Sequence, residues 1–256
     1  VGPLTRSVDD AAIMLGALAG FDARDPGSVD TPVPDYTDGI DGGIKGLRVG
    51  VPENFFFDAL DPEVETIVRA AISQLESEGA RLVPVTLPLI EHYLAVEFGL
   101  CLPEASAYHQ DMLRERADRY EDDVRTFLEI GEVIPATTYI KALRVRERIK
   151  SGWREMFDSI DVLAAPTVPA TAAKVGQENF TWRDGGEESI TSAYVRHSCP
   201  ANLTGLPSIT VPCGFSGDGL PVGMQILGRP FDEATVLRAA KAYESATDWR
   251  ARSPDL

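Results

Sequence analysis

Apolar and polar positions alternate most regularly between residues 47 and 87, where they predict a strand, a helix and a second strand. The first strand covers residues 47–51 and ends before Pro52, which has no N–H to donate to a sheet. Asp61 is suited to cap the helix that follows. The apolar residues of that helix recur at intervals of three and four, as on a helix with one buried face: Val64, Ile67, Val68, Ala71, Ile72 and Leu75. The second strand covers residues 81–87, so the unit predicts two parallel strands joined by a right-handed crossover.

Strands and helices are predicted to alternate along the rest of the chain as well. Ser7 and Asp10 form a capping box, which begins a helix that ends at Gly20. Residues 89–160 are mainly helical and are expected to form a lobe packed on the sheet. The remaining predicted elements are a strand over 161–165, an irregular insertion over 170–189, a helix over 192–203, strands over 208–213 and 222–227, and a last helix capped by Asp232. This alternation predicts one α/β domain over residues 1–256, with a mixed, mostly parallel sheet flanked by helices.

The chain is strongly acidic, with 24 Lys and Arg against 40 Asp and Glu and a net charge of −16. Such a charge repels phosphate backbones and anionic membranes, so we expect neither nucleic acid nor a membrane as a partner. No apolar run reaches the roughly 18 residues of a membrane-spanning helix. A basic run between Lys141 and Arg154 is interpreted as a solvated helix face paired with Glu147 and Glu155.

Catalytic and metal-binding signals are scarce in these residues. The three cysteines, Cys101, Cys199 and Cys213, are too widely spaced for a zinc or redox motif, and we expect reduced thiols in a cytoplasmic protein. The three histidines stand in no HExxH motif and no spaced metal cluster. No P-loop, GxGxxG or GxSxG motif is present, so the sequence predicts no cofactor and no metal. His197 and Ser198 are neighbours in sequence but point to different helix faces, and His197 is interpreted as a helix-surface residue.

The most informative segment begins with Asn202-Leu203-Thr204-Gly205-Leu206-Pro207 and continues with Val211-Pro212 and with DGLPVGMQILG over residues 218–228. From the residues alone it is a helix end that turns into a buried strand, with Gly205 in the left-handed conformation. It also resembles the C-terminal pattern of the amidase signature family. Residues 161–167 resemble that family's substrate-side strand and loop, and residues 2–12 resemble the segment after its nucleophile region. The matches follow in order from residue 2 to about residue 245, which covers nearly the whole chain.

The resemblance implies an amide hydrolase, which cleaves carboxylic amide C–N bonds. Members of the family use a serine nucleophile, a second serine in a cis conformation that relays protons, and an unprotonated lysine as the base, while backbone N–H groups stabilise the oxyanion. All of these groups precede the segment that residues 2–12 resemble, and this chain has no Gly-Gly-Ser-Ser-like run. No catalytic residue is therefore carried over to this chain.

We accordingly expect residues 1–256 to be the C-terminal half of the amidase-signature fold, to lack the upstream catalytic half and to be inactive alone. The start at Val1-Gly2-Pro3, without an initiator Met or a signal peptide, is what the middle of a longer protein would show. The expected partners are a small-molecule amide substrate, the missing N-terminal half or a companion chain, and a second copy of the chain.

Two alternatives remain open. The A-type component of aminoacyl-tRNA amidotransferases belongs to the same family, but residues 193–200 differ from the pattern expected for that component. Trp153, within residues 152–157, also resembles the stand-alone amidases more closely. The second alternative is a non-catalytic binding or scaffold module that kept half of the fold. An upstream Lys and a Ser-rich segment in the same gene or in a companion chain would distinguish an enzyme from such a module.

Four side chains are predicted to bind substrate: Thr167, Tyr194, Arg196 and Asn202. In open α/β sheets ligands bind beyond the carboxyl ends of strands, and Thr167 follows the strand over 161–165. Tyr194 and Arg196 lie on the helix whose end, at Asn202, turns into the next strand. A hydroxyl, a phenol, a cation and an amide can orient a polar or anionic substrate, so we expect the four in one cleft. The plainer interpretation is that Asn202 caps the helix end and Arg196 pairs with surface carboxylates.

Overall fold

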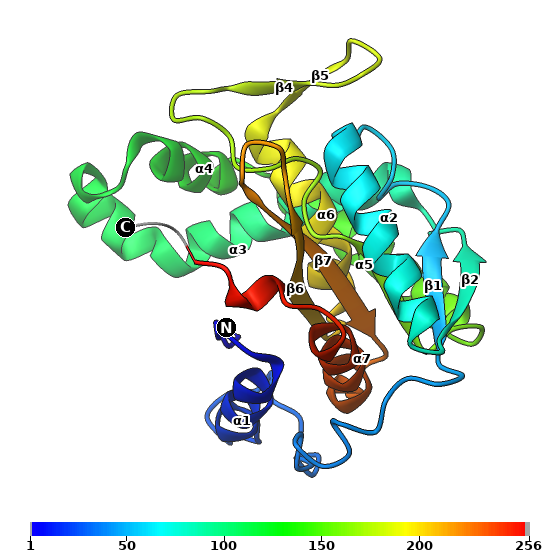
Figure 1. Ribbon diagram of the computed structural model, residues 1–256. Coiled ribbons are helices and arrows are strands. Elements are labelled where there is room, and N and C mark those ends of the chain that lie inside the picture. The colour runs from blue at the N-terminus through cyan, green and yellow to red at the C-terminus, as the bar shows by residue number, and fades with distance from the viewer. Residues whose placement is uncertain (1, 254–256) are drawn as a thin grey trace.

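The computed structural model describes residues 2–253, in which helices cover both faces of a five-stranded sheet (Figure 1). The strands are β1 (Arg48–Pro52), β2 (Arg81–Val85), β3 (Val162–Pro166), β6 (Ser208–Phe215) and β7 (Pro221–Gly228), in the order β2-β1-β3-β7-β6. β1 pairs in parallel with β2 and β3, whereas β7 is antiparallel to both β3 and β6. Four strands of this sheet therefore run in one direction and β7 runs against them, which confirms the predicted α/β class with a mixed, mostly parallel sheet.

The helices divide between the two faces of the sheet. One face carries α1 (Val8–Leu18), α2 (Pro62–Ser77) and α7 (Glu233–Ser245), and the other carries α3 (Tyr93–Arg116), α5 (Ala136–Met156) and α6 (Ile190–Thr204). Successive side chains of a strand point to opposite faces. Val162 and Ala164 of β3 accordingly lie in the first core, while Leu163 and Ala165 lie in the second. A fully buried central strand thus separates two hydrophobic cores.

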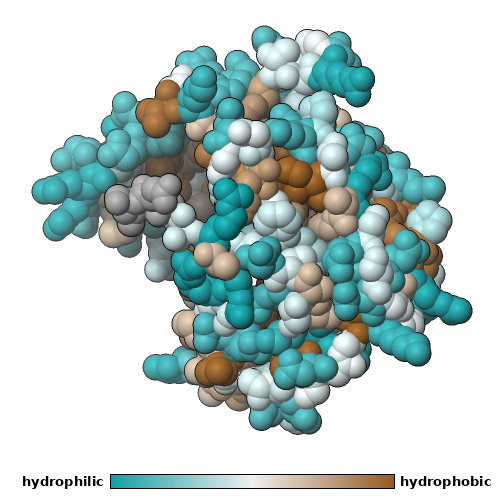
Figure 2. Space-filling view, in the orientation of Figure 1, coloured by the Kyte–Doolittle hydropathy of each residue, from teal (hydrophilic) through white to brown (hydrophobic). Residues whose placement is uncertain are grey.

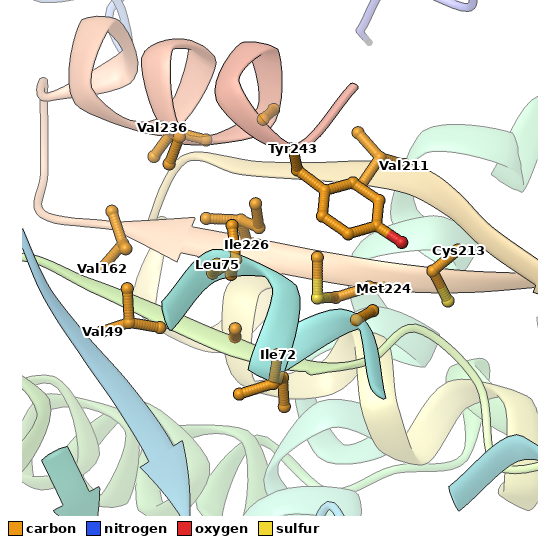
Figure 3. Packing of buried hydrophobic residues seen from close by; sticks show 14 of the residues in the cluster. Val49, Ile72, Leu75, Val162, Val211, Cys213, Met224, Ile226, Val236 and Tyr243 are labelled. Atoms are coloured by element: carbon orange, nitrogen blue, oxygen red, sulfur yellow. The ribbon is translucent and has the colours of Figure 1, made fainter. Parts of the chain in front are cut away.

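The first core contains the apolar stripe predicted for the helix after Asp61. Figure 3 shows Ile72 and Leu75 of α2 in one cluster with Val236 and Tyr243 of α7 and with strand residues. Asp61 caps α2 as predicted, because its carboxylate accepts the backbone N–H of Glu63 at 2.8 Å. Burying an aliphatic side chain of this size contributes about 2 kcal/mol, so the stripe holds α2 on the sheet.

The second core includes helices from the range predicted to form a helical lobe. A 3₁₀ turn, η1 (Ile90–His92), leads into α3, and η2 (Ala117–Arg119) leads into α4 (Asp122–Glu132), which packs along α3. Trp153 of α5 donates its indole N–H to the Tyr93 hydroxyl at 2.8 Å, and that hydroxyl donates to the Pro88 carbonyl at 2.7 Å. This buried chain of hydrogen bonds connects α5 and α3 to the segment after β2.

The prediction of an irregular insertion over residues 170–189 is wrong for part of that range. It contains a small hairpin of β4 (Asn179–Thr181) and β5 (Glu187–Ser189), which projects from the molecule near the start of α6 (Figure 1). The hairpin forms because Phe180 and Trp182 pack against α6 together with Ala193. The last element is η3 (Trp249–Ala251). Among the described residues, no helix has the length and apolar character needed to cross a membrane.

Candidate functional site

Thr167 lies where sequence reasoning predicts it, immediately after the carboxyl end of β3. Its backbone N–H donates to the Gly223 carbonyl at 3.0 Å, and its hydroxyl donates to the Thr210 hydroxyl at 3.2 Å. A Cβ at Gly223 would lie 3.0 Å from the Thr167 hydroxyl and 2.8 Å from the Thr210 methyl, so glycine is needed at this close approach. Thr210 is exposed on β6, the edge strand, so these two hydroxyls form a polar spot on the open side of the sheet.

The hydroxyl of Tyr194 holds the segment that follows β3. It donates to the Thr171 carbonyl at 3.0 Å and accepts the Ala173 N–H at 2.8 Å. Its ring contacts Phe180 of the hairpin edge to face, at 5.6 Å between centroids. Tyr194 therefore supports the loop beyond β3, and its hydroxyl is already occupied.

Arg196 is buried and is the centre of a network at the carboxyl edge of the sheet. Its Nε and Nη2 donate to the two carboxylate oxygens of Glu188 on β5, at 3.1 and 3.2 Å. Its Nη2 also donates to the Ala59 carbonyl at 2.9 Å, and its Nη1 donates to the carbonyls of Asp58 and Phe55 at 3.2 and 3.4 Å. The segment that it holds follows β1, and Phe55 and Ala59 adopt positive φ angles of 68° and 45° in it. Such angles are strained for residues with a Cβ and persist only where the surroundings fix them.

This geometry gives Arg196 a different position from the one predicted. An arginine side chain has five N–H donors, and here each guanidinium nitrogen already donates to the protein. The side chain is also not the surface ion pair of the plainer interpretation, because its carboxylate partner Glu188 is itself mostly buried. In this structure Arg196 joins the hairpin to the segment after β1 and presents no free N–H to a substrate.

His197 corrects a second prediction, since it is buried rather than on the helix surface. Its Nε2 accepts from Arg196 Nη1 at 3.0 Å, so the proton of the neutral ring lies on Nδ1, which has no hydrogen-bond partner. Phe55 and Phe56 enclose the ring at 6.2 and 5.1 Å. Burial first, and then the Arg196 charge, lower the pKa of His197 well below the ordinary value of 6.5.

The unfolding free energy should therefore depend on pH through His197. Below pH 6.5 the unfolded chain takes up a proton that the folded chain refuses, so stability falls as the pH falls, by about 1.4 kcal/mol per pH unit for one full proton. We expect urea titrations at about pH 7.5 and about pH 5.5 to show this loss in the wild type and a smaller loss in His197→Gln. Glu97, whose pKa is raised by burial, opposes the trend, but it is present in both proteins. Equal losses in the two proteins would show that His197 does not carry the effect.

Asn202 lies away from the other three predicted residues. Along α6 the side of β7 changes from Gln225, whose side chain donates to the His197 carbonyl, toward Leu227, which packs with Leu203. The helix therefore runs with β7 and against β3 and β6, and about eight residues of rise carry Asn202 roughly 12 Å from Tyr194 toward the amino ends of those strands. No pocket found among the described residues contains both Thr167 and Asn202. The structure does not gather the four predicted residues into one pocket.

A polar pocket of about 420 Å³ surrounds Asn202 between α3, α5 and α6. Asn202 Nδ2 donates to Glu97 Oε1 at 3.4 Å, and burial raises the pKa of Glu97. Arg146 lines the same pocket while its Nε donates to the Leu203 carbonyl at 2.7 Å. Glu104 accepts from the Tyr139 hydroxyl at 2.9 Å on the opposite wall. Asn202 thus presents its amide to a space shared with a partly buried carboxyl group and a cation.

A second pocket adjoins the first and was not predicted from the sequence. It has a volume of about 350 Å³, lies between α3, α4 and the start of α6, and shares Glu97, Cys101 and Ala105 with the polar pocket. The rest of its lining is Phe98, Leu102, His109, Val124, Phe127, Leu128, Thr191 and Val195. Figure 2 shows hydrophobic surface in the recess beside α4. Apolar pockets with a few polar groups are the usual form of small-molecule sites, so these two adjoining pockets are the candidate functional site.

Neither pocket has the groups of a metal site or an activated thiol. No cluster of three His, Cys, Asp or Glu able to hold a metal occurs in residues 2–253. Burial and the neighbouring carboxylates Glu97 and Glu104 raise the pKa of Cys101, which keeps this thiol protonated and weakly nucleophilic. The site can bind and orient a ligand, but its own residues offer no nucleophile paired with a base.

Comparison with known proteins shows which family has this fold. The family model described as Amidase matches residues 1–237. An amidase of Pseudomonas putida is 53% identical over 255 residues, which are 100% of this chain and 54% of that protein. The A-type component of the glutamyl-tRNA(Gln) amidotransferase of Myxococcus xanthus is 38% identical over 281 aligned positions, covering 100% of this chain and 56% of that component.

A solved structure agrees with these sequence relatives. It comes from a vestigial protein complex that bears on the origins of an s-triazine catabolic enzyme, and it superposes with a TM-score of 0.90 at 28% identity over 98% of this chain and 54% of its own. The chain thus spans about half the length of the proteins it matches. Taken with the ordered segments from residue 2 onward, these matches show that the chain belongs to the amidase family, the amidase-signature enzymes.

Proposed function

We propose that this chain forms the substrate-pocket half of a hydrolase that cleaves carboxylic amide bonds, and that the serine nucleophile, relay serine and lysine base belong to the half that it does not span. The observation that carries this proposal is the 53% identity to an amidase over the whole of this chain, which is only 54% of that enzyme. The adjoining polar and apolar pockets supply a place for an amide and its substituents.

The lysines support the location of the base outside this chain. A lysine that acts as a base must lose its proton near neutral pH, which requires burial or a neighbouring positive charge. The ammonium group of Lys241 instead pairs with Asp9, and this hydrogen bond raises the pKa of Lys241. The other four lysines, Lys45, Lys141, Lys150 and Lys174, lie outside both pockets.

One side of the molecule is suited to receive the other half. β6 is the edge strand of the sheet, and a groove of about 490 Å³ runs between it, α7 and residues 2–8. Beside the groove α1 exposes Ile13, Met14 and Leu18, and Figure 2 shows hydrophobic surface over this helix. An unpaired edge next to exposed apolar side chains favours pairing with another strand and its helices. We therefore propose the other half, either joined to this chain or as a companion chain, as the partner on this side, and self-association as the result when it is absent.

Hydrolysis is favoured over a role in an amidotransferase. The amidotransferase relatives are 35–38% identical against 53% for the amidase, and their alignments need gaps because they run over about 280 positions. The three cysteines are free, which fits the reducing cytoplasm that we propose as its location.

Ammonia release from simple amides tests the proposed function. Residues 1–256 alone should release ammonia no faster than buffer. Fusion to the part of the Pseudomonas putida amidase that this chain does not cover should raise the rate by at least about a thousandfold, because the fusion restores the nucleophile and the oxyanion donors. That part expressed alone is the control. Hydrolysis by residues 1–256 alone, lost on substitution of one of its own serines, would contradict the proposal.

A further inference from the structure

The apolar pocket between α3, α4 and α6 carries information about the substrate that the family membership does not. Two aromatic rings lie nearly parallel across it, because Phe98 of α3 and Phe127 of α4 have an interplanar angle of 7° and centroids 6.4 Å apart. Phe127 and Val124 remain 36% and 47% exposed, so their apolar side chains face an open pocket instead of a packed core. Aromatic side chains left exposed in a recess are typical of a binding surface.

No cation is available in this pocket to hold a negatively charged substituent. Neither Lys nor Arg lines it within the described part of the chain. Arg125, on the neighbouring face of α4, is already paired with Asp122 at 2.8 Å and with Glu129 at 3.7 Å. Arg146 belongs to the adjoining polar pocket and is bonded to the Leu203 carbonyl. A carboxylate placed among these side chains would lose its hydration without gaining an ion pair, which is strongly unfavourable.

The charged group that does line the pocket has the wrong sign for an anion. Glu97 stands where the apolar and polar pockets meet, and its pKa is raised by burial and also by Glu104. Whether it is ionised or protonated, it offers no positive charge to a carboxylate. Asn202, bonded to Glu97 at 3.4 Å, places an amide on the polar side of the same junction. A ligand that spans the junction would put a neutral polar group beside Asn202 and an apolar group between Phe98 and Phe127.

We propose that the substrate is an amide with an uncharged aromatic or branched alkyl substituent, which occupies the pocket between Phe98 and Phe127, and that amides with a carboxylate on that substituent are rejected. This inference rests on the proposed function for the identification of the ligand as an amide. The apolar substituent provides most of the binding free energy, at about fourfold in affinity per buried methylene. Amides without such a group, and glutamine with its charged end, bind poorly.

Binding to residues 1–256, followed by NMR of the folded chain, tests the inference without catalysis. The probes are phenylacetamide, acetamide and glutamine. We expect a Kd for phenylacetamide at least about thirtyfold below that of acetamide, and no saturable binding of glutamine. Phe127→Ala should weaken phenylacetamide about tenfold and leave acetamide unchanged. Phe21→Ala removes a similarly exposed ring outside the pocket and should change neither.

The outcomes separate this inference from the proposed function. Selective binding of phenylacetamide that responds to Phe127→Ala supports the pocket chemistry even if the fused enzyme releases no ammonia, which would count only against the proposed function. Glutamine or acetamide binding as tightly as phenylacetamide, absence of phenylacetamide binding, or an unchanged Kd in Phe127→Ala would each overturn the inference, whatever the fused enzyme hydrolyses.

Discussion

Arg196→Ala is expected to lower the free energy of unfolding by about 3–5 kcal/mol, which is a large part of the stability of an ordinary domain. The substitution leaves the mostly buried carboxylate of Glu188 without its cation. It also removes the donors to three carbonyls in the segment after β1, where Phe55 and Ala59 have positive φ angles. A strained segment without the group that fixes it should relax, and the hairpin should detach from α6. Urea titration followed by circular dichroism measures the change in midpoint.

Two further variants separate the network from a general loss of positive charge. Arg148→Ala removes an exposed arginine on α5 and should change stability by no more than about 0.5 kcal/mol. Arg196→Lys keeps the charge but cannot reproduce the forked contacts to Glu188 and the carbonyls, so it should recover only part of the loss. A loss of less than about 1 kcal/mol in Arg196→Ala would mean that the network does not hold these loops.

Gly131→Ala should lower the free energy of unfolding by about 2–3 kcal/mol and also weaken ligand binding in the apolar pocket. A Cβ at Gly131 would overlap the Ser106 hydroxyl and the Leu102 carbonyl of α3, and backbone atoms cannot turn aside. Ser106 also donates to the Leu128 carbonyl of α4, which joins the two helices at this point. Since Leu102 and Leu128 line the apolar pocket, separation of α3 from α4 should change its shape.

Gly16→Ala is the matched control, because Gly16 also lies inside a helix. Its Cβ would meet the Tyr36 ring at 4.0 Å, an ordinary contact, so the higher helix propensity of alanine should raise stability by about 0.5–1 kcal/mol. Thermal unfolding of both variants, with phenylacetamide titrations, measures the two effects. Opposite signs in the two glycines are expected, and a neutral Gly131→Ala would contradict the close packing of α3 and α4.

The elements with strong local signals could be predicted from the sequence. The helix α2 combines a capping aspartate, a proline at its start and a regular apolar stripe, and the buried residues follow that stripe. The central strand β3 reads as a continuous apolar run, and it is buried along its whole length. In contrast, β4 and β5 have three residues each and little apolar character, and they depend on the packing of Trp182 and the pairing of Glu188 with Arg196.

The candidate site was harder to predict because its contacts join distant parts of the chain. The carbonyls bonded by Arg196 precede it by 137–141 residues, so no local pattern reveals that its donors are occupied. The sequence placed Asn202 in the same cleft as Thr167, but the direction of α6 separates them. The apolar pocket gathers side chains from three helices, and its one local signal is the pair Val124 and Phe127, which α4 exposes.

Labelling with a fluorophosphonate, which reacts with activated serine nucleophiles, tests the central claim most directly: that this chain shapes the pocket while the other half supplies the nucleophile. The fusion with the uncovered part of the Pseudomonas putida amidase and residues 1–256 alone are both treated, digested and analysed by mass spectrometry. The account predicts one labelled serine in the fusion, located outside residues 1–256, and no label on residues 1–256 alone. A labelled serine within residues 1–256 would contradict it.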